Sequence, residues 1–280
     1  MSHVIIIGGG AAGMMAAIAA AGAGHKVCIY EKNEKLGKKI YITGKGRCNV
    51  TNACDTEELF RNVVHNAKFL YSSFYTFTNT DVMDLIEKYG CPLKTERGGR
   101  VFPVSDKSSD VIHALTVALR ELGVEVELHE EVSGVLAEDG HVSGVRLKRG
   151  QKVVPADAVI VTTGGLSYPS TGSTGDGYRF ATELGHTITE LSPALVPFEA
   201  KEAVCKDLQG LSLRNISVQI RNGKKVLYEE FGEMLFTHFG VSGPVLLSAS
   251  SYVASIRHGK NTNKIREAHS FWRNIFNHGA

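Results

Sequence analysis

The first 31 residues combine an apolar run, a glycine motif and a second apolar run in an order that strongly constrains the fold. Residues 4–7 are aliphatic without alternation, which is typical of a strand buried on both faces of a parallel sheet. A Gly-x-Gly-x-x-Gly motif follows directly, at Gly8, Gly10 and Gly13. Small residues over 14–23 then predict a helix, and residues 27–30 predict a second strand. This order predicts a β-α-β unit at the start of an α/β domain.

The residues of this unit have separate physical roles in such a motif. Gly8 would make the tight turn, Gly10 would let the backbone approach a diphosphate, and Gly13 would let the helix pack on the strand. The start of the helix offers free backbone amides and the positive end of the helix dipole, and Ala12 lies just before it. Glu31 closes the second strand and could accept a hydrogen bond from a ribose hydroxyl. We therefore predict a dinucleotide site, with NADP disfavoured because Glu31 would repel its 2′-phosphate.

Composition argues against several classes of protein. The chain has 31 Lys and Arg against 29 Asp and Glu, and this net charge of +2 argues against a nucleic-acid partner. Five cysteines without a Cys-x-x-Cys spacing favour neither a disulfide framework nor a zinc site, so no metal is expected. The uncharged run over 4–24 is interrupted by glycines and has no basic segment before it, which argues against a signal peptide or membrane span. We expect a soluble, cytoplasmic protein with no membrane partner.

The glycine motif does not distinguish FAD from NAD, but the order of the later elements favours FAD. A helix is predicted over 109–122 and a strand over 124–128. Two further strands are predicted around 138–141, and another over 158–162 leads into Thr163, Gly164 and Gly165. This antiparallel interruption is typical of flavoproteins with two dinucleotide folds, whereas simple NAD dehydrogenases keep strands and helices alternating. An NAD-dependent dehydrogenase stays open as an alternative.

Five longer motifs carry a resemblance to a known family. They are LGKKIYITGKGRCNVTN at 36–52, GGRVFP at 98–103, GGLSYPSTGSTGDGYRFA at 164–181, PALVP at 193–197 and FGEMLFTHFGVSGP at 231–244. Together they resemble the bacterial NAD(P)/FAD-dependent oxidoreductases that include aminoacetone oxidase-like enzymes and BaiN-type bile-acid reductases. The resemblance implies a glutathione-reductase-type, Rossmann-like FAD-binding domain over 1–190, with an inserted, mostly β domain over 191–254. It also implies hydride transfer between a small organic substrate and FAD, with NAD(P)H or oxygen as the second partner.

The resemblance further implies a set of cofactor-binding residues. Besides the glycine motif with Ala12, they are Glu31 and Lys32 at the ribose end, Val132 at the adenine, Thr163 and Gly164 beside the pyrophosphate, and a loop along the flavin with Lys38, Lys39, Gly46, Arg47, Cys48 and Asn49. The residues themselves agree, because a loop with several glycines and cations can place amides and positive charge beside phosphates or a reduced flavin. A solvated loop face is the alternative for each cation.

Four residues are candidates for catalytic roles. Arg47 could support an anionic flavin, and Arg100 could hold a carboxylate or carbonyl substrate. Tyr168 could donate a proton, and His238 is the best placed of the eleven histidines for general acid catalysis. Purely structural roles for Tyr168 and His238 stay open. Cys48 is not expected to be redox-active, because the spacing to the next cysteine differs from that of disulfide reductases.

The last part of the chain contains a hairpin and then changes in character. Residues 215–228 predict a hairpin whose type I′ turn is formed by Asn222 and Gly223, and a helix begins near 245. The family pattern stops at about residue 254, and residues 255–280 form a basic tail. We therefore expect a chain truncated at the C-terminus, with an incomplete inserted domain and flavin pocket; a naturally short homologue stays open as the alternative. A nucleotide- or flavin-binding protein without turnover is the alternative function, and the sequence indicates neither the substrate nor the oligomeric state.

Overall fold

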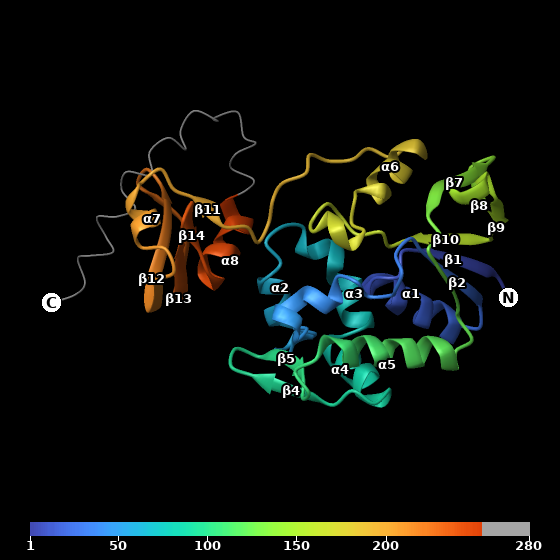
Figure 1. Cartoon of the computed structure of the whole chain (residues 1–280), viewed down its shortest axis with the longest axis horizontal. Coiled ribbons are helices and arrows are strands. Elements are labelled where there is room, and N and C mark those ends of the chain that lie inside the picture. Colours follow the sequence, from blue (N-terminus) through green and yellow to red (C-terminus); the bar gives the residue numbers. More distant parts are fainter. Residues whose placement is uncertain (254–280) are drawn as a thin grey trace. The chain divides into compact units, whose positions relative to one another are not determined.

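The computed structural model describes residues 1–253, which form two compact units (Figure 1). The first unit spans Met1–Ile188, and the second begins at Thr189. The predicted domain limits at 190 and 191 stay a prediction, because compactness alone does not test whether a segment folds independently. The predicted basic tail lies outside the described residues.

A four-stranded parallel sheet with the order β10-β1-β2-β6 forms the centre of the first unit. Its strands are β1 (His3–Ile7), β2 (Lys26–Glu31), β6 (Glu125–Leu128) and β10 (Ala158–Val161). The chain adds β2 and β6 on one side of β1 before it returns to β10 on the other side. The order therefore reverses at β1. In open α/β sheets such a switch point leaves a crevice at the carboxyl ends of the strands, where ligands bind.

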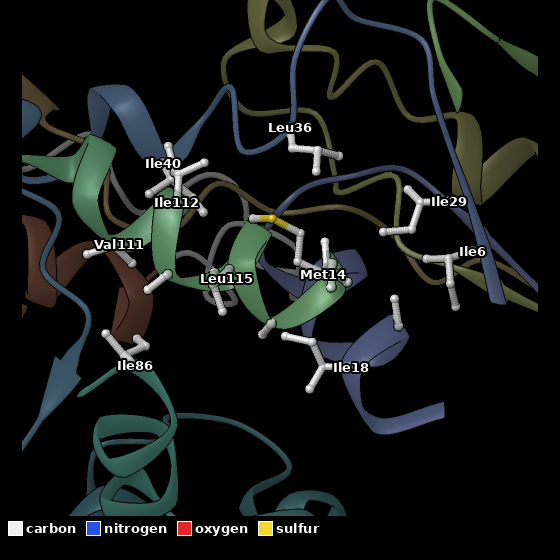
Figure 2. Packing of buried hydrophobic residues seen from close by; sticks show 14 of the residues in the cluster. Ile6, Met14, Ile18, Ile29, Leu36, Ile40, Ile86, Val111, Ile112 and Leu115 are labelled. Carbon is white, nitrogen blue, oxygen red and sulfur yellow. The ribbon is translucent and has the colours of Figure 1, made fainter. Parts of the chain in front are cut away.

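Both faces of β1 are buried, which explains its uninterrupted apolar run. On one face, Val4 and Ile6 belong to a buried cluster with side chains of α1 (Ala11–Gly22), α4 (Asn79–Lys88) and α5 (Ser108–Glu121), and Figure 2 shows Ile6 in this cluster. On the other face, Ile5 and Ile7 lie in a second cluster with side chains from β7 (Val132–Glu138), β8 (His141–Leu147) and α6 (Asp176–Glu183). The predicted α/β class with a parallel sheet is confirmed.

Helix α1 begins at Ala11, three residues earlier than the sequence predicted. The turn after β1 needs only the first glycines, of which Gly8 has a positive φ of 102°. The two alanines that follow Gly10 are strong helix formers, so the chain enters the helix inside the motif.

The remaining elements of the first unit are two small antiparallel sheets and short helices. The predicted meander consists of β7 (Val132–Glu138), β8 (His141–Leu147) and β9 (Val153–Pro155). The other sheet consists of β3 (Thr51–Asn52), β4 (Leu93–Glu96) and β5 (Arg100–Pro103). The short helices are α2 (Thr56–Arg61), α3 (Tyr71–Thr76) and α6 (Asp176–Glu183), with 3-10 turns at Ile40–Gly46, Ala67–Leu70, Arg149–Gln151 and Pro169–Thr171.

The second unit is mostly β, as predicted. Its antiparallel sheet has the order β11-β14-β13-β12. The elements are β11 (Phe198–Glu199), α7 (Val204–Asp207), β12 (Ser212–Asn222), β13 (Lys225–Thr237), β14 (Gly240–Ser242) and α8 (Pro244–Val253). Met234, Phe236, Val241 and Leu246 lie in its buried cluster, which joins the sheet to α8.

The predicted type I′ turn at Asn222 and Gly223 is wrong by one residue. Asn222 pairs with Lys225 at the end of the ladder, so Gly223 and Lys224 form the turn. Of these two, only Gly223 has a positive φ, at 59°, whereas a type I′ turn needs two positive φ angles. The pairing register shifts just before Arg221.

Two glycines of α1 provide a matched test of the packing between helix and strand. A Cβ at Gly13 would lie 1.8 Å from the Gly8 carbonyl oxygen, whereas a Cβ at Gly22 would meet nothing within 4 Å. Gly13→Ala should therefore lower the free energy of unfolding by about 2 kcal/mol or more. Gly22→Ala should raise it by up to about 1 kcal/mol, because alanine is the better helix former. Urea unfolding of both variants measures this difference, and equal effects would contradict the close packing.

Candidate functional site

Three segments that are far apart in the sequence meet at the carboxyl ends of β1, β2 and β10. The amide of Gly8 donates to the Tyr30 carbonyl at 2.9 Å, which joins the end of β1 to the end of β2. The Thr162 amide donates to the Ile7 carbonyl at 2.9 Å, and its hydroxyl donates to the Gly8 carbonyl at 2.9 Å. The glycine motif is therefore held between the two neighbouring strand ends.

The start of α1 is open and has no side-chain cap. Gly10 is the N-cap residue, in extended conformation, and no side chain in residues 1–253 bonds the amides of the first turn. A Cβ at Gly10 would have no heavy atom within 4 Å, so the space beside it is free. The first amides of a helix have no partner within the helix and attract anions. Ala11, Ala12 and Gly13 can therefore offer their amides to a phosphate.

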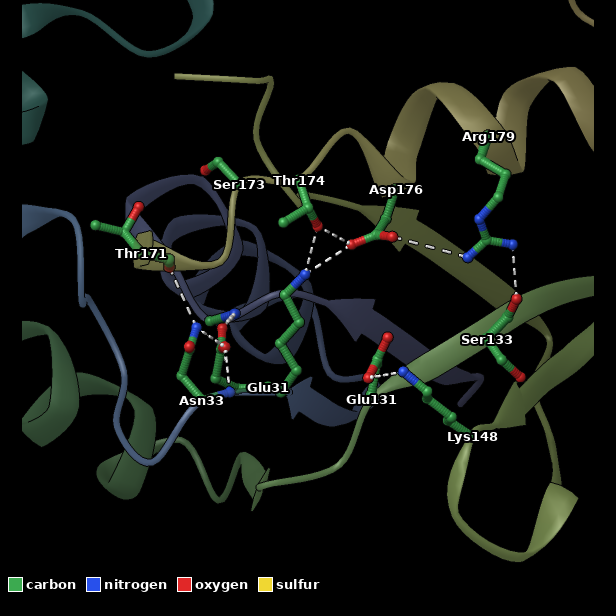
Figure 3. Close-up of polar contacts among 12 residues, drawn as sticks. Glu31, Asn33, Glu131, Ser133, Lys148, Thr171, Ser173, Thr174, Asp176 and Arg179 are labelled. Atoms are coloured by element: carbon green, nitrogen blue, oxygen red, sulfur yellow. Dashed lines mark hydrogen bonds and ion pairs between the residues drawn. The ribbon is translucent and has the colours of Figure 1, made fainter. Parts of the chain in front are cut away.

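Glu31 is a buried carboxylate at the end of β2, with an exposed fraction of 7%. Its Oε2 accepts a hydrogen bond from the Gly9 amide at 2.6 Å. Its Oε1 accepts from the backbone amide of Asn33 at 2.8 Å and from the Asn33 side chain at 2.6 Å (Figure 3). An ionised carboxylate has about four acceptor sites. Glu31 can therefore still accept a hydrogen bond from a ribose hydroxyl.

Thr163 follows β10 and has a buried hydroxyl without a hydrogen-bond partner in the described part of the chain. Leaving such a group unpaired costs about 1–3 kcal/mol, so its position favours a polar ligand atom nearby. The next residue, Gly164, has a φ of 75°, and a Cβ there would lie 2.7 Å from the Ser173 hydroxyl. With the open helix start and Glu31, these groups fit a ribose and a diphosphate.

Two of the three predicted cofactor lysines, Lys32 and Lys39, bond the glycine-rich segment 164–177 that follows β10. Lys32 forms an ion pair with Asp176 at 2.7 Å (Figure 3), and Lys38 bonds the carboxylate four residues before it at 3.1 Å. Lys39 instead donates to the Ser173 hydroxyl at 2.7 Å and, within residues 1–253, bonds only neutral oxygens. Lys39 is thus the lysine of this group whose charge is least compensated, and it best suits a phosphate.

Arg47 takes part in an ion-pair network. Its guanidinium contacts the carboxylates of Glu96 and Asp106, the latter at 2.6 Å, and stacks over the Phe102 ring at 4.2 Å. Lys94 also reaches Asp106, at 2.8 Å. Arg47 therefore attaches the 40–48 loop to the β4–β5 hairpin. Its role beside a flavin stays a prediction, because two carboxylates already compensate its charge.

The remaining loop residues have distinct surroundings. Gly46 has a φ of 88°, and Asn49 is exposed. Cys48 is buried with a φ of 61°, and burial raises the pKa of its thiol, which disfavours the reactive thiolate. Val132 is buried at the start of β7, opposite Leu147. Contacts of these residues with a flavin or an adenine stay predictions.

The other catalytic candidates have separate surroundings. Arg100 is exposed and donates to the Arg97 carbonyl at 3.2 Å. Tyr168 is 65% exposed and has a left-handed backbone with φ of 53°. His238 belongs to the second unit, is exposed and packs edge-on against Phe239. A shared active site of these residues stays a prediction. Within residues 1–253, no group of three His, Cys, Asp or Glu side chains is placed to hold a metal ion.

Sequence reasoning missed Asn33 as a residue of this site. Its amide bonds both Glu31 and the Thr171 carbonyl, so it joins the end of β2 to the glycine-rich segment. The available signal was a short polar side chain two residues after the acid, since asparagine readily bonds nearby backbone and side-chain groups outside regular elements.

Gly10→Val tests whether the open helix start binds a diphosphate. Since the space beside Gly10 is free and its backbone is extended, the variant should fold with nearly unchanged stability. The added side chain would occupy the position of the diphosphate, so binding of the dinucleotide should weaken at least about tenfold. Isothermal titration with FAD, together with thermal unfolding of the ligand-free chain, measures both effects. Unchanged affinity in a folded variant would contradict this assignment.

Arg47→Met tests the ion-pair network by its effect on two carboxyl groups. Hydrogen bonding by Arg47 lowers the pKa of Glu96, and Lys94 together with Arg47 lowers the pKa of Asp106. Lowered pKa values stabilise the fold above the ordinary value of about 4, and this contribution is lost as the pH falls through the lowered values. In Arg47→Met, NMR titration should show the Glu96 pKa returning toward its ordinary value, with a smaller change at Asp106. Arg61→Met, outside the network, should change neither value; a Glu96 pKa that is the same in both variants would rule out the network.

Comparison with known proteins identifies the family. The HI0933-like protein Rossmann domain matches residues 2–254. The chain is 33% identical over 270 residues to a 3-dehydro-bile acid delta(4,6)-reductase of Clostridium scindens, covering 95% of this chain and 64% of the relative. It is 32% identical over 248 residues to a ribosomal RNA dihydrouridine synthase of Escherichia coli, covering 89% and 60%. The chain thus spans about three fifths of the length of these relatives.

A solved structure supports the fold. The open conformation of a flavocytochrome c3 fumarate reductase superimposes with a TM-score of 0.56 at 21% identity, covering 76% of this chain and 47% of that chain. At this identity the likeness concerns the fold alone. The family match over residues 2–254 agrees with the resemblance seen in the motifs and implies FAD as the cofactor. The chain therefore belongs to the HI0933-like family of flavin-dependent oxidoreductases with a Rossmann-like FAD-binding domain.

Proposed function

We propose that this chain binds FAD and serves hydride transfer between a small organic substrate and the flavin, with NAD(P)H or oxygen as the second partner. The observation that carries the proposal is the grouping of an open helix start, a buried carboxylate and an unpaired hydroxyl at adjoining strand ends. These groups match the diphosphate and ribose of a dinucleotide. The alternative of an NAD-dependent dehydrogenase lacks support from the family match.

Different groups of the chain would bind different parts of the cofactor. The first amides of α1 would bind the diphosphate, with Lys39 supplying positive charge, and Glu31 would accept from the ribose. Thr163 could bond the diphosphate through its free hydroxyl. The backbone of Val132 would meet the adenine. When bound, FAD supplies the ability to accept and donate hydride.

On the substrate side, the proposal assigns roles to three exposed groups. The Arg100 guanidinium has no ion-pair partner within residues 1–253 and could hold a carboxylate or carbonyl group by paired hydrogen bonds. The Tyr168 hydroxyl or the His238 ring could supply a proton to the substrate. Small conjugated carbonyl compounds are suitable substrates for such a set, because a cation polarises the carbonyl while hydride adds to the conjugated carbon.

Reduction of a base in RNA is a second candidate function, favoured by a cluster of aromatic rings. Phe60, Tyr71, Phe74 and Tyr75 of α2 and α3 contact one another with ring centroids 4.7–5.8 Å apart, and Phe69 between these helices is 85% exposed. Exposed rings stack on bases in single-stranded nucleic acid. The small net charge of the chain led to the expectation that it has no nucleic-acid partner. That expectation is not supported, because the Escherichia coli relative is a ribosomal RNA dihydrouridine synthase.

The proposal includes the cytoplasmic location expected from the sequence. In residues 1–253, no helix has both the length and the apolar character needed to cross a membrane.

Anaerobic spectroscopy of the purified 280-residue chain tests the proposed function. We expect the chain to bind FAD, and bleaching of the flavin absorbance when NADH or NADPH is added would support turnover. Reoxidation by a conjugated enone supports the small-molecule function, whereas reoxidation by a uridine-containing RNA supports the second candidate. Gly10→Val is the control and should stay colourless. A chain that binds no FAD would overturn the proposal, and a bound flavin that neither NADH nor NADPH reduces would favour a binding protein without turnover.

A further inference from the structure

Asn33 uses every polar group it has to join segments around Glu31. Its backbone amide and its side-chain nitrogen both donate to Glu31 Oε1, at 2.8 and 2.6 Å. The side-chain nitrogen also donates to the Thr171 carbonyl at 3.2 Å, and the side-chain oxygen accepts from Lys38 at 3.3 Å. The Asn33 carbonyl accepts from the His129 amide at 3.1 Å. One residue thus connects the end of β2 to the loop before β7 and to the segment after β10 (Figure 3).

These contacts leave Glu31 with an unequal pair of oxygens. A carboxylate oxygen has two acceptor sites, and both sites of Oε1 are filled by Asn33. Among the described residues, Oε2 accepts only one hydrogen bond, from the Gly9 amide. Because Glu31 is buried, its charge depends on these three donors, which also fix the orientation of the carboxylate.

We propose that Asn33 is a positioning residue of the adenosine pocket, which orients Glu31 so that Oε2 alone accepts a hydrogen bond from a single ribose hydroxyl. This inference rests on the proposed function, in which Glu31 meets the ribose of FAD. Asn33 itself need not touch the cofactor, since it acts through the carboxylate.

The glycine-rich segment leaves room for this arrangement. A Cβ at Gly172 would lie 2.6 Å from the side-chain nitrogen of Asn33 and 3.3 Å from Lys32 Cε. Gly172 also has a φ of 99°, which side chains rarely adopt. The absence of a side chain at this turn therefore allows the Asn33 amide to reach both Glu31 and the Thr171 carbonyl.

The contact with His129 extends the arrangement toward the expected adenine position. His129 has a left-handed backbone with φ of 58° and is followed by the short link to Val132 at the start of β7. The amide of Glu130 in this link donates to the Glu31 carbonyl at 3.1 Å. Backbone hydrogen bonds from residues 129 and 130 to residues 31 and 33 thus fix the position of the carboxylate proposed for the ribose relative to the start of the strand proposed for the adenine.

Binding of FAD and of its 2′-deoxyadenosine and 3′-deoxyadenosine analogues to the full chain tests the inference. In the unmodified chain, loss of one hydroxyl, but not of the other, should weaken binding about tenfold, as expected for a hydrogen bond to a charged acceptor. Asn33→Ala should weaken FAD about tenfold and leave the affinity for the sensitive deoxy analogue within about twofold, because that analogue no longer senses Glu31. Asn33→Asp should weaken FAD further, since a second carboxylate would face Glu31. Asn62→Ala, which removes an exposed asparagine elsewhere, is the control and should change nothing.

Three results would overturn the inference. They are an unchanged FAD affinity in Asn33→Ala, an equal loss for FAD and the sensitive analogue, and equal sensitivity of the unmodified chain to both deoxy changes. If Asn33→Ala does not fold, Gly172→Ala displaces the same amide and should give the same selective loss. A chain that binds no FAD at all would instead overturn the proposed function, so the two failures are distinguishable.

Discussion

The carbonyl oxygen of Gly8 occupies the space that a side chain at residue 13 would need, since a Cβ there would lie 1.8 Å from it. This close approach lets α1 start directly after the turn that ends β1, and within residues 1–253 no side chain caps its first amides. The Thr162 hydroxyl holds the Gly8 carbonyl from the neighbouring strand. The anion-binding end of the helix therefore depends on backbone packing that only glycine permits.

The charged residues around the start of α1 differ in their hydrogen-bond and ion-pair partners, and these partners indicate which role each residue suits. Glu31 is buried and held by three N–H donors, which suits a fixed acceptor for a sugar hydroxyl. Lys39 bonds only neutral oxygens within the described residues, so its uncompensated charge suits a phosphate. The charge of Arg47 is instead compensated by Glu96 and Asp106. The glycine-rich segment after β10 is tied to the end of β2 by Lys32 and Asn33. A ligand at the strand ends would thus meet polar groups that are already oriented by hydrogen bonds and ion pairs.

Local sequence patterns were sufficient for the elements that form this site. The uninterrupted apolar run of β1 indicated burial on both faces, and the glycine motif placed the turn before α1. Contacts between distant segments were not predictable in the same way: the carboxylates that pair with Arg47 lie 49 and 59 residues further along the chain. The role of Asn33 depends on where the turn at Thr171 comes to lie, and the position of the hairpin turn depends on a pairing register that the residue pattern does not reveal.

NMR chemical shifts of the backbone amides, recorded while FAD is added to the isotopically labelled chain, test most directly whether the start of α1 binds the cofactor. The largest changes should occur at Ala11, Ala12 and Gly13, with a further change at the Gly9 amide as Glu31 Oε2 takes on a second donor. Binding that shifts amides elsewhere and leaves these four unchanged would show that the cofactor sits at another place on the molecule.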